Sequence, residues 1–447
     1  MQMRRLFRAF VVFAALLVAV RASAQSFDGD ARKAAMGGGG NDVNIAAGMV
    51  DPAEGYSVVP IPLGLIQVLT NLEVFDPTGD EFDPVAAIEL GGNPLHYTFG
   101  RKSGSASRPQ QQFMRDIVNG QLNRDLTTYS GFHLPTDVSA EGLLSSSFGK
   151  TFKFANKPSG AFQGFYIGAG PYFSFSTDAA IDPRLSDIFD TGTRYTNTTL
   201  SVQDVSEVQL AMSVVFGYRG RLEVPGWSGD RDGIYLAGNY RYLRGFKYLG
   251  PDMAVRFDTD NAGLLTLSPA TTPIAIDNLE GDRGTGRAID VGVQIVRDRW
   301  EGGVGINGIA NKIDWTELTR KRFTLNSLFA GGDFVEQTVA NPPGTVTVEL
   351  PVVTTGNVAY NGEEYGFSAV VTHGFNGNSF HSGAEKTFGP LAVRGGARFS
   401  RGHWDPTWGV GFGRRVAVDV GFYGTHSNLE EKQQISMAIS IRIMPNR

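Results

Sequence analysis

The sequence of 447 residues contains no cysteine. This absence excludes disulfide bonds, thiolate metal sites and a lipid anchor on an N-terminal cysteine, and it suits a chain that crosses an oxidising compartment unfolded. Positive charge is not in excess either, because 40 Lys and Arg stand against 45 Asp and Glu, for a net charge of −5. The charge balance therefore gives no support to nucleic-acid binding.

Long apolar runs are also missing after residue 20, and the mean hydropathy is −0.13. These two features exclude a helical membrane protein. The first residues differ from the rest, because three arginines between residues 4 and 8 precede an apolar segment at residues 9–20 and the small residues Ala22-Ser23-Ala24. This order predicts a cleaved signal peptide at residues 1–24, with Gln25 as the mature start. The protein is therefore expected to leave the cytoplasm.

What the chain does contain is alternation, most clearly from Gln434 to Ile443. Successive side chains of an extended chain point to opposite faces, so one face of this segment is wholly apolar and the other is small and polar. A helix would scatter the same residues around its circumference. We therefore predict a strand of about ten residues here.

Similar alternation, punctuated by turn residues, continues through most of the sequence after residue 85. It predicts about 14 antiparallel strands, an even number. Pro351 marks one of them as irregular or weakly paired. The predicted strands lie within residues 85–100 and at residues 142–154, 164–176, 208–219, 234–242, 288–295, 300–307, 345–353, 365–373, 379–388, 391–400, 407–413, 417–423 and 434–443.

The two faces of these strands favour a membrane barrel over a soluble sandwich. In a sandwich the polar face meets bulk water and should be rich in Lys and Glu. Here it carries mainly Gly, Ala, Ser, Gln, Asn and Tyr, while the other face carries Phe, Ile, Val and Leu, with Trp or Tyr near several strand ends. We predict an all-β fold, a transmembrane antiparallel β-barrel of about 14 strands with an N-terminal periplasmic or lumenal plug segment.

The alternation assigns individual residues to the two faces. Lumen-facing candidates are Gln209, Arg219, Arg241, Asp290, Gln294, Glu301, Glu385, Arg394, Arg398, Asp419 and Arg442. Lipid-facing candidates are Val208, Leu210, Met212, Val214, Phe216, Ile435, Met437, Ile439, Ile441 and Ile443. A tight turn at Gly389-Pro390 would also place Glu385 directly opposite Arg394, within reach of an ion pair.

Loop lengths predict the orientation, because such barrels have short periplasmic turns and long outer loops. The short connections at residues 155–159, 223–232 and 297–299, and the tight turns at 389–390 and 414–415, are expected on the periplasmic side with both termini. Long outer loops are expected at residues 177–206, 244–284 and 314–343. The predicted domains are the signal peptide at residues 1–24, a plug or periplasmic segment at 25–84 and an outer-membrane barrel at 85–447.

Two stretches resemble a known superfamily. The run D-A-R-K-A-A-M-G-G-G-G at Asp30–Gly40 resembles the G-A-R-x-x-x-M-G-G-A opening of outer-membrane barrels that include long-chain fatty-acid transporters, type IX secretion barrels of the PorV type and conjugal-transfer TraF-like proteins. The run G-A-E-K-T-F-G-P-L-A-V-R-G-G resembles their C-terminal strands. The chain departs from the pattern by lacking the downstream Asn-Pro-Ala-Gly segment and by ending in I-M-P-N-R rather than on an aromatic residue. The resemblance implies a 14-stranded outer-membrane barrel.

No catalytic, metal or cofactor site is predicted. His426 and Ser427 superficially resemble the pair of barrel lipid hydrolases, but adjacent strand residues point to opposite faces and cannot act as base and nucleophile. His373 and His381 are interpreted as satisfied polar residues. An acidic run, Asp178, Asp182, Asp187 and Asp190, could bind a divalent cation or bridge to lipid A phosphates, although a solvated loop is the simpler interpretation. The chain is therefore not expected to be an enzyme.

Two functions stay open from the sequence. The first is a passive channel for small molecules, hydrophobic ones among them, with residues 25–84 folded into the lumen; the resemblance suggests it, and the apolar run at residues 58–69 supports it. The second is a structural or secretion-associated platform that binds envelope proteins through its loops. Both place the chain in the outer membrane, in contact with outer-membrane lipid and lipopolysaccharide and with no nucleic acid.

Overall fold

The computed structural model describes residues 30–37, 44–50, 57–72, 95–99, 108–119, 121–134, 136–145, 147–157, 160–266, 274–325, 334–374, 377–400, 402–427 and 432–443. The predicted signal peptide and most of the strand predicted within residues 85–100 lie outside them. Within these ranges no helix is long and apolar enough to cross a membrane.

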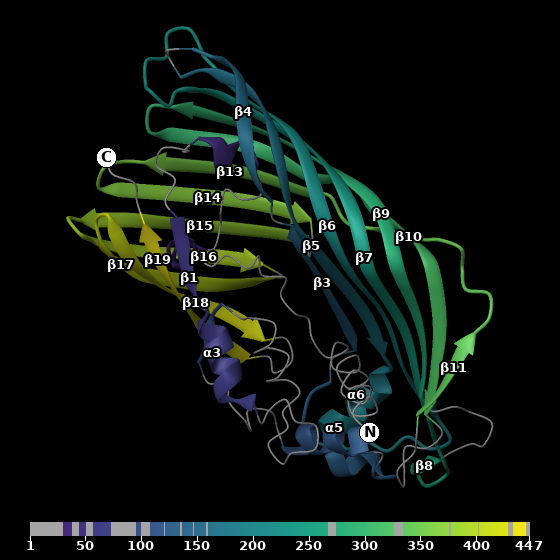
Figure 1. Ribbon diagram of the computed structural model, residues 1–447. Helices are drawn as coiled ribbons and strands as arrows, with labels where there is room; N and C mark the ends of the chain where they lie inside the picture. The colour runs from purple at the N-terminus through teal and green to yellow at the C-terminus, as the bar shows by residue number, and fades with distance from the viewer. Residues whose placement is uncertain are drawn as a thin grey trace.

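The chain is an all-β protein built on one large antiparallel sheet, which curves around an interior (Figure 1). The strands are β1 (Ser57–Ile61), β2 (Tyr97–Thr98), β3 (Asp137–Ser145), β4 (Phe148–Asn156), β5 (Phe162–Ile181), β6 (Thr199–Leu222), β7 (Gly233–Thr259), β8 (Leu265–Thr266), β9 (Ile274–Arg297), β10 (Trp300–Leu325), β11 (Phe334–Val339), β12 (Val346–Glu349), β13 (Val353–Asn361), β14 (Tyr365–Gly374), β15 (Gly377–Phe388), β16 (Leu391–Ser400), β17 (His403–Gly413), β18 (Val416–Ser427) and β19 (Lys432–Ile443). The helical elements are α2 (Ala31–Ala35), η2 (Ala47–Met49), α3 (Leu63–Thr70), α5 (Arg108–Asn119), η4 (Leu126–Tyr129) and α6 (Pro183–Thr191).

Strand order in the sheet follows the sequence. One edge consists of β3 and β4, which pair with different parts of β5. The sheet continues through β6, β7, β9 and β10 to β13, and then through β14 to β19. At the other edge β1 and β2 pair with β19. Among the described residues no pairing joins β19 to β3 or β4, so a closed barrel stays a prediction. Residues 57–61, which fall in the predicted plug segment, are part of the sheet as β1.

Five neighbouring strands are much longer than the sequence pattern predicts. β5, β6, β7, β9 and β10 contain 20, 24, 27, 24 and 26 residues. The outer loops predicted at residues 177–206, 244–284 and 314–343 are therefore too long, because strands occupy part of each range. On β6 the buried positions are even-numbered up to Ser206 and odd-numbered from Gln209 to Arg219. A change of parity of this kind ends a simple alternation although the strand continues.

The strand predicted at residues 345–353 also needs correction. Residues 346–349 form the short β12, and the strand that continues the sheet is β13, with Pro351 between the two. Both pair with β10. Proline has no backbone N–H to donate to a ladder, which explains why the pairing is interrupted at this point.

The predicted short connections lie at one end of the sheet, which we call the turn end, whereas equally short ones between β14 and β15 and between β16 and β17 lie at the other end. Register places Leu222 opposite Ile234, Arg297 opposite Trp300, and Phe388 opposite Leu391. The long strands extend away from it to the opposite end, which we call the loop end, where α5 and α6 lie (Figure 1). The short connections named in the prediction therefore share one end, but short turns are not confined to it.

At the loop end the inner face of the long strands is apolar. α6 begins with an Asp182 N-cap and ends at Gly192, whose φ of 72° is the left-handed conformation common after helices. Together with α5 and η4 it covers the ends of β5, β6, β7 and β9. Their shared core consists of Phe113, Leu122, Leu126, Tyr129, Ala179, Ile181, Leu185, Ile188, Phe189, Leu200, Met253, Phe257, Leu265, Ile274, Ile276 and Phe323.

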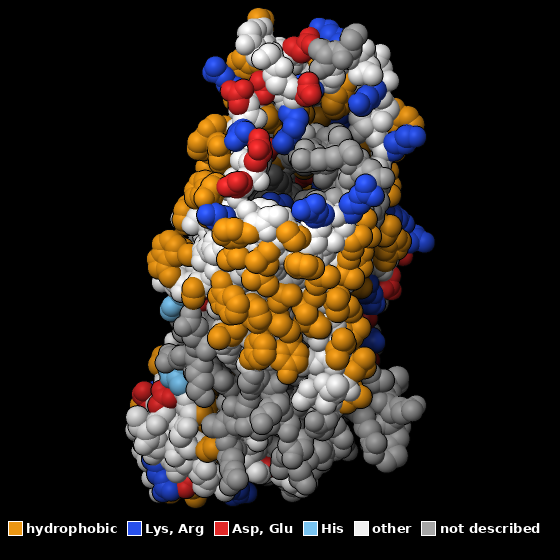
Figure 2. Space-filling model, turned by 90° about the vertical axis from the view of Figure 1, so that its left-hand side faces the viewer, with side chains coloured by type: hydrophobic (Ala, Val, Ile, Leu, Met, Phe, Trp, Pro, Cys, Tyr) orange, Lys and Arg blue, Asp and Glu red, His pale blue; other side chains and the backbone are white. Residues whose placement is uncertain are grey.

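Toward the turn end the outer face carries exposed apolar side chains, which we call the apolar band. On β6 Leu210, Met212, Val214 and Phe216 are 39–51% exposed. On the side where β14 to β19 lie, Figure 2 shows hydrophobic side chains gathered in one broad patch with charged side chains above it. Exposed aromatic residues stand near the strand ends, among them Trp300, Tyr365 and Trp404. Such an outer surface is typical of strands that face lipid.

Candidate functional site: the polar inner face

The inner face is the face on which residues 30–37 and 44–50 pack, and the predicted lumen-facing residues lie on it. All eleven are buried or partly buried, and their buried members are Gln209, Arg219, Asp290, Gln294, Glu301, Arg394 and Asp419. The predicted lipid-facing residues are exposed or half-buried; the half-buried ones are Val208, Met437, Ile439 and Ile441. The two predicted sets therefore occupy opposite faces. That these faces meet a lumen and a lipid phase stays a prediction.

One inner cluster centres on Asp290 of β9. Arg241 Nε of β7 donates to Asp290 Oδ2 at 2.5 Å, and the backbone N–H of Gly308 donates to Asp290 Oδ1 at 3.1 Å. Asp290 and Arg241 side chains are only 4% and 11% exposed. Such a pair is stable only when hydrogen bonds satisfy both partners. The Nη1 of Arg241 has no partner among the described protein atoms, so this face keeps a buried donor available.

A second cluster joins the N-terminal segment to β9 and β13. Asn44 Nδ2 donates to Gln294 Oε1 and to Asn357 Oδ1, each at 3.1 Å, and Asn357 Nδ2 donates to Gln294 Oε1 at 3.1 Å. Asn44 and Gln294 are 0% exposed. Three amides that satisfy one another in this way fix the position of η2 against the sheet.

A third cluster is made of charges from β15, β16, β18, β19 and α2. Arg32 Nη2 lies 3.0 Å from Glu385 Oε1, and Arg394 Nε donates to Glu385 Oε2. Arg394 Nη1 lies 2.8 Å from Asp419 Oδ1, and Arg442 Nε donates to Asp419 Oδ2 at 2.9 Å. Glu385 and Arg394 are register partners, which confirms the pair predicted from the turn at Gly389-Pro390.

Backbone contacts complete the docking of residues 30–37. The N–H of Ala31 donates to Ser440 Oγ at 3.1 Å, and Thr407 Oγ1 accepts from Gly37 N–H and donates to the Ala35 carbonyl, both at 2.9 Å. A Cβ on Gly383 would lie 2.6 Å from the Met36 backbone. Glycine at such positions of the inner face therefore makes room for the N-terminal segment. Sequence reasoning assigned these small residues to a wet lumen and missed this contact.

The histidines are engaged as predicted. His381 Nδ1 donates to the Gly37 carbonyl at 2.6 Å, and His373 Nδ1 contacts Asn378 Oδ1 at 2.8 Å. Within the described ranges no group of His, Asp and Glu is arranged to hold a metal ion. The side chains of His426 and Ser427 lie outside the described features.

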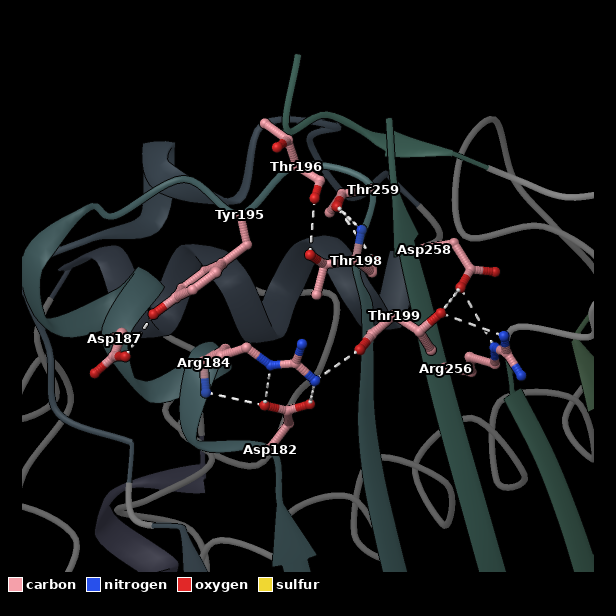
Figure 3. A network of polar contacts seen from close by, with 10 residues as sticks. All are labelled: Asp182, Arg184, Asp187, Tyr195, Thr196, Thr198, Thr199, Arg256, Asp258 and Thr259. Atoms are coloured by element: carbon pink, nitrogen blue, oxygen red, sulfur yellow. Dashed lines mark hydrogen bonds and ion pairs between the residues drawn. The ribbon is translucent and has the colours of Figure 1, made fainter. Parts of the chain in front are cut away.

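The acidic run at residues 178–190 serves α6 and its surroundings. Asp182 caps the helix and pairs with Arg184 Nη2 at 2.6 Å, while Tyr195 Oη donates to Asp187 Oδ2 at 2.7 Å (Figure 3). Asp190 Oδ2 contacts His133 Nδ1 at 3.0 Å. Hydrogen bonding by Arg184 lowers the pKa of Asp182. Three of the four carboxylates are thus used by protein partners, which fits a folded loop better than a cation site.

Comparisons with known proteins add the following. No family model and no curated protein matches the sequence. The structure is similar to the toluene transporter TodX of Pseudomonas putida, with a TM-score of 0.33, 10% identity, and coverage of 72% of this chain and 92% of that chain. It is also similar to the toluene transporter TbuX of Ralstonia pickettii, with a TM-score of 0.33, 11% identity, and coverage of 74% and 94%. A Rhodopseudomonas blastica porin mutant matches with a TM-score of 0.21, 8% identity, and coverage of 62% and 100%.

Proposed function

We propose that the chain closes into an outer-membrane β-barrel, with both termini periplasmic, and forms a passive channel for small molecules. The observation that carries the proposal is the inversion of the two faces. Apolar side chains such as Phe216 are exposed on the outside, whereas charged ones such as Asp290 and Arg394 are buried on the inside. A water-soluble protein arranges its faces the other way round, and a lipid-embedded barrel requires this arrangement.

The N-terminal segment supports a plugged channel. Residues 30–37 and 44–50 pack on the inner face through Arg32 and Asn44, which bind opposite parts of the sheet. Further toward the loop end the inner face is lined by apolar side chains that include Tyr172, Leu243, Ile313 and Trp315. An interior that is polar near the turns and apolar beyond them suits small hydrophobic or amphiphilic molecules. No catalytic role is proposed.

Conductance in planar bilayers tests the channel. The variant Arg32→Gln with Asn44→Ala removes the two polar anchors of the N-terminal segment, and it is expected to conduct more than the wild type because the plug loosens. Arg283→Gln, an outer-face change far from the interior, is the control and should conduct like the wild type. Bilayers that show only lipid background with all three proteins would contradict the proposal.

A platform for envelope proteins is the second candidate. It is favoured by the loop-end part of the long strands, which carries its own apolar core with α5 and α6. A folded unit outside the apolar band offers a rigid binding surface. Pull-down from cell envelopes with the full chain tests it, and a co-purified protein that is lost when the exposed pair Arg283 and Glu317 is changed would favour this function.

A further inference from the structure

The loop-end border of the apolar band carries three basic residues on neighbouring strands. They are Arg244 of β7, Arg287 of β9 and Lys312 of β10. Below them, toward the turn end, the outer faces of β9 and β10 are apolar, with Val291, Ile295 and Val304 39–57% exposed. Beyond them these faces carry Thr285, Arg283, Asp314 and Thr316. The border between apolar and polar surface therefore coincides with the basic residues.

Register brings these three side chains together. Arg287 is directly opposite Lys312, and Arg244 is opposite Thr285, two residues from Arg287 on the same face. Directly opposed Cβ atoms lie about 4.5–5.5 Å apart and diagonal ones about 7–8 Å apart. Like charges directly opposite each other destabilise a sheet. The cluster is therefore not explained by the stability of the strands.

The three residues also differ from the charged residues around them. Among the described residues their side chains make no hydrogen bond or ion pair. Neighbouring cations do: Arg283 Nη1 lies 2.7 Å from Glu317 Oε1, and Lys247 Nζ lies 2.8 Å from Asp282 Oδ1. The nearest acids on the outer face are Asp314, which accepts the Thr347 hydroxyl at 2.5 Å, and Glu349, the register partner of Lys312. Three cations beside two acids leave the border net positive.

The apolar surface next to the cluster shows what kind of anion fits. Arg244 stands between Tyr242 and Phe246, which are 41% and 54% exposed, and Met212 is its register partner on β6. Tyrosine is favoured where a lipid bilayer meets water. A ligand that covers both the apolar band and the basic border therefore needs acyl chains for the band and phosphate groups for the border. Lys and Arg bind phosphate strongly, Arg often through two hydrogen bonds.

We propose that Arg244, Arg287 and Lys312 form a binding site for the phosphate groups of lipid A in the outer leaflet. This inference rests on the proposed function, which places the loop end at the outer surface. Of the candidate lipid contacts in the chain, this cluster replaces the acidic run at residues 178–190, whose carboxylates are mostly used within the protein.

Lipid binding by the full chain in detergent tests the site, with diphosphoryl lipid A as the probe. The variant Arg244→Gln, Arg287→Gln, Lys312→Gln is expected to bind about a hundredfold more weakly, because each basic residue near an anionic surface contributes roughly a factor of five. The matched control changes three paired cations farther from the band, Arg283, Arg320 and Lys321, to Gln. It should bind within about twofold of the wild type.

The proposal is overturned if the triple variant binds like the wild type, if the control loses as much affinity, or if dephosphorylated lipid A binds equally well. Equal binding of phosphatidylglycerol vesicles would also overturn it in favour of a general phospholipid site. Circular dichroism and bilayer conductance of the same triple variant separate the two proposals. Normal conductance of the triple variant with unchanged lipid A binding contradicts only the lipid site. A wild type that binds lipid A more tightly than the triple variant but does not conduct contradicts only the channel.

Discussion

Glu385 connects the N-terminal segment to the sheet through a single carboxylate. It accepts from Arg32 on one side and from Arg394 on the other, and its side chain is 13% exposed while that of Arg394 is 0% exposed. Removing one member of such a buried pair leaves the other charge without compensation, at a cost of about 3–5 kcal/mol. An exposed pair would contribute only about 0–1 kcal/mol.

A double-mutant cycle with Glu385→Gln and Arg394→Gln measures how strongly these two side chains are coupled. We expect a coupling free energy above about 1 kcal/mol in urea unfolding, because neither group is solvated. Repeating the cycle in an Arg32→Gln background is the control, and the coupling should persist there because Arg394 still faces Glu385. A coupling near zero would indicate a solvated interior.

Asp204 gives a pH dependence outside the apolar band. It is 0% exposed and accepts hydroxyl hydrogen bonds from Thr177 at 2.7 Å and Ser206 at 2.9 Å, and burial raises its pKa. The unfolded value is about 3.9. The folded state therefore binds the proton more tightly, so the free energy of unfolding should decrease as pH rises from about 4 through the raised pKa.

The variant Asp204→Asn should lose this slope, because an amide does not titrate in the range. Urea unfolding at a series of pH values between 4 and 7 measures it. Asp178→Asn on the neighbouring strand retains Asp204 and therefore most of the slope, because burial is the largest cause of the raised pKa and the charge of Asp178 adds less. The same slope in Asp204→Asn as in the wild type would show that Asp204 does not cause it.

Sequence reasoning located these single residues well where alternation is regular. The opposition of Glu385 and Arg394 follows from one tight turn and a strict period of two, and it is confirmed. Glu385 contacts Arg32, which lies 353 residues away in the sequence, so a local pattern could not reveal this contact. The only signal for this contact in the sequence was the run of small residues, Gly383 among them, on the face of the strands that points inward.

Among the secondary-structure elements, α2 depends on its contacts with the sheet rather than on its own helical stability. It has five residues, too few to persist alone, and it depends on the inner faces of β15 to β19. Gly383→Ala places a Cβ 2.6 Å from the Met36 backbone, whereas Gly395→Ala on β16 meets its nearest atom, the Thr407 carbonyl oxygen, at 4.0 Å.

Limited trypsin digestion compares these two variants. Overpacking of about 1–3 kcal/mol at Gly383 should increase the rate of cleavage after Arg32 and Lys33 roughly tenfold to a hundredfold, since cleavage requires release of α2. Gly395→Ala should be cleaved like the wild type. Equal protection of α2 in both variants would contradict its docking on this face.

The positions of the strands could be read from the sequence, but their lengths could not. The prediction began β6 at Val208, next to the point where the buried face changes from even to odd residues. Beyond that point the inner face is apolar and the outer face is charged, the reverse of the part within the apolar band. The two parts of the strand therefore carry opposite alternating patterns. A search for one alternating pattern finds only the part within the apolar band and interprets the rest as a loop.

For the whole molecule, the arrangement of turns and long strands predicts which end faces the cell exterior. The chain has no cysteine, so single cysteines can be labelled without background. A membrane-impermeant thiol reagent on whole cells should label Ala262→Cys at the loop end and leave Ser228→Cys, in the turn between β6 and β7, unlabelled. Lysed cells, in which both sites are accessible, are the control. Labelling of Ser228→Cys alone would reverse the orientation.

The pairing of β1 with β19 has a consequence for the order of events during assembly. Ser57 meets Ile443, and Ala31 binds Ser440, 409 residues farther along the chain. The segment that is synthesised first must therefore wait until the final strand is made before it has a partner. Closing so long a loop costs little extra free energy, because the entropy grows only with the logarithm of length, but distant contacts form slowly. The N-terminal segment can therefore dock only after the C-terminal strand is in place, so a chain truncated before β19 would leave β1 and β18 without their partner.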